Sequence, residues 1–269
     1  LGLIELQGSK LTLTGYGRNW EKRLPRDLPT VPKTERELIP EPLVEELPEP
    51  PAPTEPPKKW PGLAEILQAF ESAPSVQSFV FDRGQLIALH NALHCAGRKR
   101  FAILSGLSGT GKTQLMKKYA ELFCGAVGVN AAQHCQIVAV SPDWRDPTGL
   151  LGYVNELRND PSYLPGPALG LLLAAHEHPE HPYFLLLDEM NLARVELYFA
   201  PLLSAMETGG ALVLHTRNSS VEEVPASIQW PANLFIIGSV NMDETTHPFS
   251  DKVLDRAFTL EFSEVDLPR

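Results

Sequence analysis

The chain has 269 residues, 43% of them hydrophobic, which is enough for one sizeable core plus a tail. Its formal net charge is −10, so the chain as a whole repels phosphate backbones, and a nucleic-acid partner would need a local patch or another domain. No apolar run approaches the roughly 20 residues that span a bilayer and no secretory signal opens the chain, so we expect a soluble, cytoplasmic protein without a membrane partner.

The three cysteines, Cys95, Cys124 and Cys135, are odd in number and widely spaced. This spacing matches neither a disulfide framework nor a CxxC metal or redox pair. We therefore predict reduced, buried thiols.

The first 61 residues differ in character from the rest of the chain. Residues 3–14 alternate apolar and polar side chains around a Gly-Ser turn, which predicts a hairpin, and we interpret residues 1–24 as the remnant of a preceding domain. Prolines then recur among glutamates, a composition that cannot bury enough apolar surface to fold. We interpret residues 25–61 as an extended acidic linker; a polyproline ligand for a partner is the alternative.

Residues 62–269 carry the pattern of one α/β domain. Two helical patterns, in residues 62–73 and 82–97, come first. His90 and His94 lie one turn apart in the second pattern, but HNALH lacks the glutamate of a zinc hydrolase, so we predict ordinary helix histidines. Apolar runs predict five strands, and their near-continuous apolarity indicates a mainly parallel sheet flanked by helices. The strands are expected at 100–106, 136–141, 183–189, 234–241 and 258–262, with helices near 112–122, 167–176, 195–207 and 251–256.

A complete G-x-x-x-x-G-K-[ST] motif, GLSGTGKT, follows the first strand of the predicted sheet and opens a helix. Its glycines allow a tight loop whose N–H groups converge on phosphate oxygens, and the helix N-terminus adds a favourable field. We expect Lys112 to bridge the β- and γ-phosphates and the Thr113 hydroxyl to ligate Mg²⁺. The predicted nucleotide-binding residues are Gly106, Leu107, Ser108, Gly109, Thr110, Gly111, Lys112, Thr113 and Gln114.

Two acids end a buried strand, where the phosphate loop of such a sheet also lies. Asp188 can hold Mg²⁺ through its water shell, and Glu189 can accept a proton from the attacking water. Adjacent carboxylates also occur as ordinary solvated residues at strand ends. Because the phosphate loop precedes them, we assign Asp188 to the metal and Glu189 to catalysis.

Asn241 and Arg256 are further candidates for catalysis. Asn241 ends another apolar strand, where its neutral amide could orient the water, although an asparagine there is also a common cap or turn residue. Arg256 precedes the last strand and is a candidate arginine finger for a neighbour's site. A surface ion pair of Arg256 with Asp255 or Glu261 is the alternative.

The combination of GLSGTGKT, LLLDEMNLARVE and GSVNMDETTHPFSDKVLDRAFTLEF resembles the AAA+ NTPases of the McrB type, in the wider group that includes MoxR and midasin modules. The similarity covers roughly residues 76–264. DEMN is similar to the DEIN or DELN of these families. The resemblance implies that Asp188 and Glu189 are Walker B acids, Asn241 the sensor-1 residue and Arg256 an arginine of the finger region.

Such proteins form hexameric homo-oligomeric rings with nucleotide sites between subunits, so the resemblance implies a finger acting in trans. Residues 140–169 look like the helix-2 insert of this group, and residues 209–233 like its hairpin before sensor 1. Both would face the pore of the ring and grip a substrate. No helical lid or sensor-2 arginine is expected within residues 62–269.

The resemblance leaves the nucleotide and the substrate open. McrB carries M-N-T-A-D where this chain has Val240-Asn241-Met242-Asp243-Glu244, so we favour ATP, with GTP as the alternative. The expected function is an ATP-hydrolysing ring motor of a McrB-like restriction or phage-defence system with a nuclease partner. The alternatives are a MoxR-like chaperone, a GTP-specific McrB-like GTPase, a non-hydrolysing scaffold and a P-loop kinase.

Overall fold

A computed structural model describes residues 4–7, 10–13, 60–74, 76, 82–95, 99–157, 161–217, 221–242 and 247–262. The chain forms two units, Leu1–Thr54 and Glu55–Arg269. In the first, strands β1 (Ile4–Gln7) and β2 (Lys10–Leu13) pair antiparallel with Ile4 opposite Leu13, which confirms the predicted hairpin. The predicted linker lies outside the described residues except at its end.

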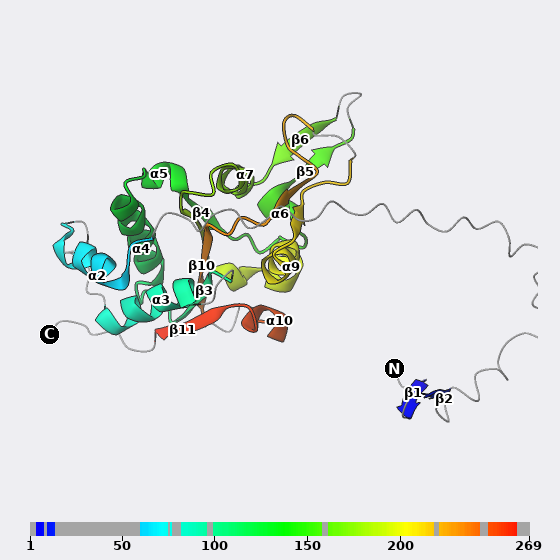
Figure 1. Cartoon of the computed structure of the whole chain (residues 1–269), viewed down its shortest axis with the longest axis horizontal. Coiled ribbons are helices and arrows are strands. Elements are labelled where there is room, and N and C mark those ends of the chain that lie inside the picture. Colours follow the sequence, from blue (N-terminus) through cyan, green and yellow to red (C-terminus); the bar gives the residue numbers. More distant parts are fainter. Residues whose placement is uncertain are drawn as a thin grey trace, which may run out of the picture. The chain divides into compact units, whose positions relative to one another are not determined.

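The second unit is built on a five-stranded sheet, as predicted (Figure 1). All neighbouring strands run parallel, in the order β11-β3-β10-β7-β4. The strands are β3 (Phe101–Gly106), β4 (Cys135–Ala139), β7 (Tyr183–Asp188), β10 (Leu234–Asn241) and β11 (Phe258–Phe262).

The sheet register brings three motif-bearing strand ends to one edge. Asn241 of β10 lies beside Gly106 of β3, and Asp188 of β7 lies beside Ala139 of β4. Strand β7 ends at Asp188, one residue before the predicted end, because Glu189 adopts a left-handed conformation and the chain turns into the 3-10 helix η3 (Met190–Leu192). A ligand-binding site is therefore expected at the carboxyl ends of these strands.

Helices cover both faces of the sheet, because alternate residues of each buried strand point to opposite sides. On one face, Phe184, Leu186 and Phe235 pack against α2 (Leu63–Ser72), α3 (Arg83–Cys95) and α4 (Lys112–Val127). The short α5 (Ala131–His134) precedes β4. The two helices expected before the first strand of the sheet are thus confirmed as α2 and α3.

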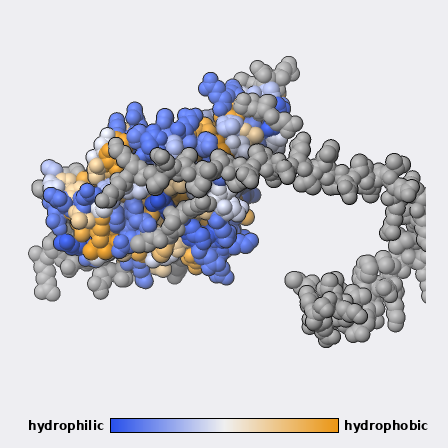
Figure 2. All heavy atoms as spheres, viewed as in Figure 1, coloured by the Kyte–Doolittle hydropathy of each residue, from blue (hydrophilic) through white to orange (hydrophobic). Residues whose placement is uncertain are grey.

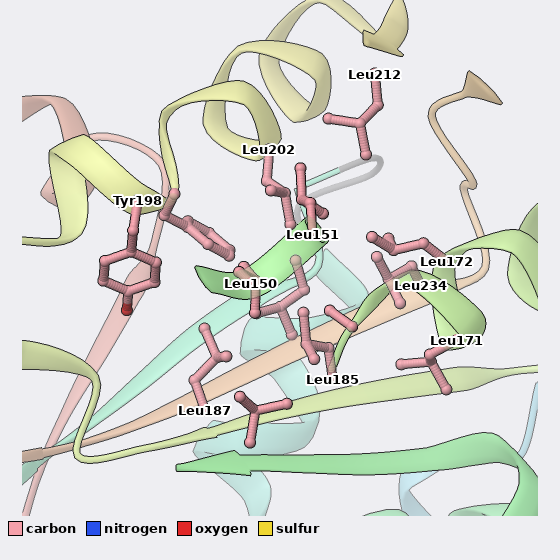
Figure 3. Packing of buried hydrophobic residues seen from close by; sticks show 14 of the residues in the cluster. Leu150, Leu151, Leu171, Leu172, Leu185, Leu187, Tyr198, Leu202, Leu212 and Leu234 are labelled. Atoms are coloured by element: carbon pink, nitrogen blue, oxygen red, sulfur yellow. The ribbon is translucent and has the colours of Figure 1, made fainter. Parts of the chain in front are cut away.

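The opposite face carries a leucine-rich core, drawn in Figure 3. Leu185 and Leu187 of β7 pack there with residues from four helices and with Val253 near the end of the chain. The four are α6 (Thr148–Leu151), α7 (Leu169–Glu177), α8 (Val195–Tyr198) and α9 (Ala200–Thr208). In Figure 2, hydrophilic residues predominate on the visible described surface, with smaller apolar areas between them.

The helix predicted at 195–207 is wrong as a single element. The chain forms α8 and α9, which meet at Phe199, where the backbone has φ −104° and ψ 0°. Pro201 explains the break, since proline has no N–H for the helical ladder and its ring clashes with the carbonyl four residues earlier. The predicted helix at 251–256 is shorter, ending as α10 (Asp251–Leu254).

Two hairpins interrupt the alternation of strands and helices. Strands β5 (Gly152–Asn155) and β6 (Ser162–Pro165) pair antiparallel within the predicted insert, and Figure 1 shows this hairpin projecting from the body of the unit. Strands β8 (Ala211–Val213) and β9 (Ser227–Gln229) pair before β10. Both predicted insertions therefore contain a hairpin.

The thiols of Cys124 and Cys135 are free, and their Sγ atoms lie 3.7 Å apart, whereas the side chain of Cys95, the third cysteine of the prediction, lies outside the described residues. Cys124 is buried and Cys135 half-buried. The contact with the Cys124 thiol and burial both raise the pKa of Cys135. A raised pKa disfavours the reactive thiolate, so the Cys135 thiol is a poor nucleophile at neutral pH.

Candidate functional site

The phosphate-loop motif has the predicted local structure: strand β3, then a loop, then helix α4. Gly106 has a φ of +157°, and a Cβ there would come within 2.4 Å of the Phe262 carbonyl oxygen, so only glycine fits. Gly111 caps α4 in the left-handed conformation, with φ 86°. The glycine spacing thus lets the chain reverse between a buried strand and a helix.

Lys112 is 4% exposed, so its ammonium group needs partners. Its Nζ donates to the carbonyl oxygens of Gly106 (3.0 Å) and Leu107 (2.6 Å) and contacts Thr110 Oγ1 at 3.2 Å. Thr110 in turn donates to the Leu107 carbonyl at 2.9 Å. The loop therefore holds the end of the lysine by its own backbone oxygens.

Asp188 receives hydrogen bonds from two hydroxyl groups. Thr113 Oγ1, in the first turn of α4, donates to Asp188 Oδ1 at 2.7 Å, and Ser239 Oγ of β10 donates to the same oxygen at 2.6 Å. This carboxylate therefore joins the phosphate-loop helix to two strands of the sheet.

Glu189 lies at the turn that follows β7, with φ 52° and ψ 48°. This left-handed conformation is strained for a residue with a Cβ and occurs often at functional sites. Its backbone N–H donates to Ser239 Oγ at 3.0 Å, and its Oε1 accepts a hydrogen bond from Asn241 Nδ2 at 3.0 Å. The carboxylate is thus held against the end of β10.

The backbone at the end of β10 is fixed from two sides. The Met242 N–H donates to the Gly106 carbonyl at 3.3 Å, and Asn191 Nδ2 donates to the Asn241 carbonyl at 2.9 Å. Asn191 itself accepts a hydrogen bond from the His247 N–H at its backbone carbonyl. The N of DEMN therefore ties the acidic turn to the predicted sensor strand.

These side chains surround a cavity of about 260 Å³. It is lined by Ser108, Gly109, Gly111, Lys112, Thr113, Gln114, Asp188, Glu189, Ser239 and Asn241. The three other predicted loop residues, Gly106, Leu107 and Thr110, are those whose oxygens hold the Lys112 ammonium. The structure thus gathers the sequence-predicted phosphate-loop, acidic and asparagine residues at one place.

Arg256 does not line this cavity. Its guanidinium forms an ion pair with Glu207 of α9, and Nη1 donates to the Lys252 carbonyl at 2.5 Å. The partner is neither Asp255 nor Glu261, the two acids considered from sequence. Within this chain, Arg256 is therefore a residue of the α9–α10 contact.

Ser239 and Asn191 were missed by sequence reasoning. Ser239 precedes Asn241 by two residues in a strand, and side chains two apart share a face, so the period of the strand could have placed it beside the acids. Asn191 lies within DEMN, but its bond to the end of β10 depends on the path of η3, for which we find no sequence signal.

The donor set fits a polyphosphate with a divalent cation. The α4 helix runs for 16 residues from Lys112, and the positive end of its dipole favours an anion at its N-terminus. Hard cations prefer oxygen ligands, and the Thr113 hydroxyl and Asp188 carboxylate supply them next to that anion position. Glu189 and Asn241 line the same cavity and are hydrogen-bonded to each other, so together they can hold a water molecule.

His90 and His94 form a separate polar group on α3. Their rings stack with centroids 4.3 Å apart, and His90 Nδ1 shares a hydrogen bond of 3.0 Å with the Tyr119 hydroxyl. Over the described part of the chain, no group of three histidine, cysteine or acidic residues could hold a metal. Both histidines lie on α3, as predicted, and their rings pack against each other.

No helix among the described residues is long and apolar enough to cross a membrane. No protein-family model matches the chain, and no curated protein matches it. Among solved structures, the chain is similar to a candidate ATPase from Cytophaga hutchinsonii, with 16% identity and a TM-score of 0.42 over 74% of this chain and 50% of that one. The chain thus spans half the length of that protein. So distant a likeness does not bear on function, and the site geometry has to carry the argument.

Proposed function

We infer that the chain is a Mg²⁺-dependent NTPase of the AAA+ class that hydrolyses ATP. The observation that carries this proposal is the single cavity that brings Lys112 and the α4 N-terminus together with Asp188, Glu189 and Asn241. The lysine and the helix N-terminus suit a triphosphate, and the carboxylates suit a metal and a water.

Each residue has a role that follows from its position. Lys112 and the first N–H groups of α4 bind the β- and γ-phosphates, and Thr113 and Asp188 hold Mg²⁺, which when bound neutralises charge on the phosphate oxygens. Glu189 accepts the proton of the attacking water, and Asn241, hydrogen-bonded to Glu189, orients that carboxylate and the water. A scaffold that only binds nucleotide has no need of Glu189 beside Asn241, which favours hydrolysis.

The sequence resemblance supports a hexameric ring with Arg256 acting on a neighbour's nucleotide. Leu107 and Met242 flank the site residues and are each 61% exposed, and Leu254 and Phe258 flank Arg256 with partly exposed side chains. Apolar side chains left beside a nucleotide site suit contact with a second copy. On assembly, Arg256 would exchange Glu207 for the γ-phosphate of the neighbour.

Mixed rings test the finger. Arg256→Ala and Lys112→Ala subunits are each expected to be inactive alone, and mixing them should restore hydrolysis because one hybrid interface has an intact Lys112 and an intact Arg256. The measurement is phosphate release against mixing ratio, with ring formation followed by sedimentation. No recovery at any ratio, with rings present, would remove Arg256 from the mechanism.

The same resemblance supports a McrB-like restriction or phage-defence role with a separate nuclease subunit, and a MoxR-like chaperone ATPase is the second candidate. A hollow of about 380 Å³ lies between the β5–β6 and β8–β9 hairpins, lined by Tyr153, Val213 and Arg217 among others. This surface suits a substrate gripped by a ring. Nucleic acid contacts would come from these hairpins or from other domains.

The deciding experiment measures hydrolysis of ATP and of GTP by the purified full chain, with Mg²⁺ or with a chelator, and with or without DNA. We expect Mg²⁺-dependent hydrolysis that prefers ATP; stimulation by DNA favours the McrB-like role. A well-folded protein that binds neither MgATP nor MgGTP in calorimetry would overturn the proposal. A preference for GTP would leave the site assignment intact and change the nucleotide.

A further inference from the structure

We propose that Ser239 is a positioning residue for both acids of the site, an inference that rests on the proposed NTPase function. Ser239 lies on β10 and is 2% exposed. Its hydroxyl group donates to Asp188 and accepts from Glu189, so one oxygen atom joins the metal-binding acid to the water-activating acid.

The bond to Asp188 fixes which oxygen of the carboxylate faces α4. Ser239 and Thr113 both donate to Oδ1, from opposite elements, at 2.6 and 2.7 Å. A hydroxyl group has one donor and two acceptor lone pairs, so Thr113 can keep its bond to Asp188 while offering a lone pair to a cation. Ser239 is not a proposed metal ligand, so its bond can keep the Asp188 carboxylate aligned while Thr113 binds the metal.

The bond to Glu189 acts on the backbone. The chain must leave β7 and enter the left-handed conformation at Glu189, which its Cβ disfavours. The Ser239 oxygen accepts the Glu189 N–H at 3.0 Å at this turn. Without this acceptor the turn is free to relax, and the carboxylate would move away from Asn241, to which it is bonded at 3.0 Å.

Ser239→Ala removes both bonds and leaves every group that contacts the triphosphate in place. We therefore expect nucleotide affinity in the absence of Mg²⁺ to stay within about 3-fold of wild type. Turnover should fall by about 10- to 100-fold, and the Mg²⁺ concentration for half-maximal rate should rise several-fold, as is typical when a residue that orients metal ligands is lost.

Ser239→Thr keeps the hydroxyl group and should have a turnover within a few-fold of wild type. Ser239→Val replaces that hydroxyl by a methyl group in a side chain of the same shape as threonine, and its turnover should be as low as that of Ser239→Ala. The matched control is Ser105→Ala, which removes a buried serine hydroxyl from the neighbouring strand β3 and should leave rate and Mg²⁺ dependence unchanged. Comparing Thr with Val tests the hydroxyl even if Ser239→Ala fails to fold.

The possible outcomes distinguish a failure of the Ser239 role from a failure of the proposed NTPase function. If wild type hydrolyses ATP and Ser239→Ala has the same kcat and Mg²⁺ dependence, the positioning role is wrong and the NTPase assignment stands. Equal activity of the Thr and Val variants overturns it as well. If wild type neither binds nor hydrolyses nucleotide, the proposed function itself fails.

Discussion

Two groups of hydrogen-bonded polar side chains in the described part of the chain invite comparison, one at the carboxyl ends of the strands and one between α3 and α4. At the strand ends, Asp188, Glu189, Ser239 and Asn241 bond to one another around a cavity. Between the helices, His90 and His94 bond to Tyr119, and His94 stacks against Phe123. Of the two, the first has acids that line a cavity together with the Lys112 cation.

His90 and His94 have the spacing of a metal-binding pair in the sequence, but in the structure their rings pack with aromatic side chains between α3 and α4. Burial lowers the pKa of both histidines, and the nearby His90 and Arg100 add to the effect at His94, whose pKa falls to about 3. The lowered pKa values of these two histidines therefore result mainly from burial and do not by themselves indicate a binding site. Three variants can test whether the two groups differ as described.

The largest effect is expected from Glu189→Gln. The amide keeps the shape and the contact with Asn241 but cannot accept a proton, so turnover should fall by about 100- to 10,000-fold with MgATP affinity retained. Phosphate release and calorimetry measure the two quantities. Glu177→Gln, an exposed glutamate at the end of α7, is the control. Normal turnover of Glu189→Gln would assign the proton acceptor elsewhere.

Lys112→Ala should follow. It removes a buried cation that the loop oxygens aim at the cavity, and charge-assisted hydrogen bonds contribute about 1.5–3 kcal/mol each, so MgATP affinity should fall by about 100-fold. Lys118→Ala is the control, because Lys118 lies on the same helix and pairs with Glu121 on the surface. Equal affinities of the two variants would contradict the binding role of Lys112.

The smallest effect concerns stability and belongs to the histidine group. Because the folded-state pKa of His94 is lowered, the unfolded chain takes up the proton first, and stability falls as pH drops from about 6.5 towards 3. The slope from one such proton is at most about 1.4 kcal/mol per pH unit.

His94→Phe should flatten this dependence and leave ATP hydrolysis at neutral pH unchanged. Urea unfolding at pH 5 and pH 7.5 measures the difference, with His176→Phe, an exposed histidine of α7, as the control. An unchanged slope in His94→Phe would show that other groups set the acid sensitivity.

Motif residues were predictable because their chemistry is local in sequence. The motif glycines, Lys112 and Thr113 lie within eight consecutive residues. Asp188 and Glu189 follow four consecutive apolar residues, and such a run predicts a buried strand. The five strands were placed within two residues of their ends for the same reason.

What was missed depends on pairing between distant segments. The ion pair of Arg256 joins α10 to a glutamate 49 residues earlier in the chain, and Ser239 meets Asp188 only because β10 pairs with β7 in one register. The effect of Pro201 on a helix follows from its missing N–H, so the break was predictable. We instead predicted one continuous helix because the apolar residues of 195–207 have helical spacing.

The close approach of Phe262 to Gly106 makes the last strand a structural wall of the proposed nucleotide site. The Phe262 carbonyl occupies the space that a side chain at position 106 would need, and β11 pairs with β3 along its whole length. A substitution at Gly106 would thus act by pushing β11 outward. Conversely, a displacement of β11 would reshape the candidate phosphate loop without any change to a residue that lines the cavity.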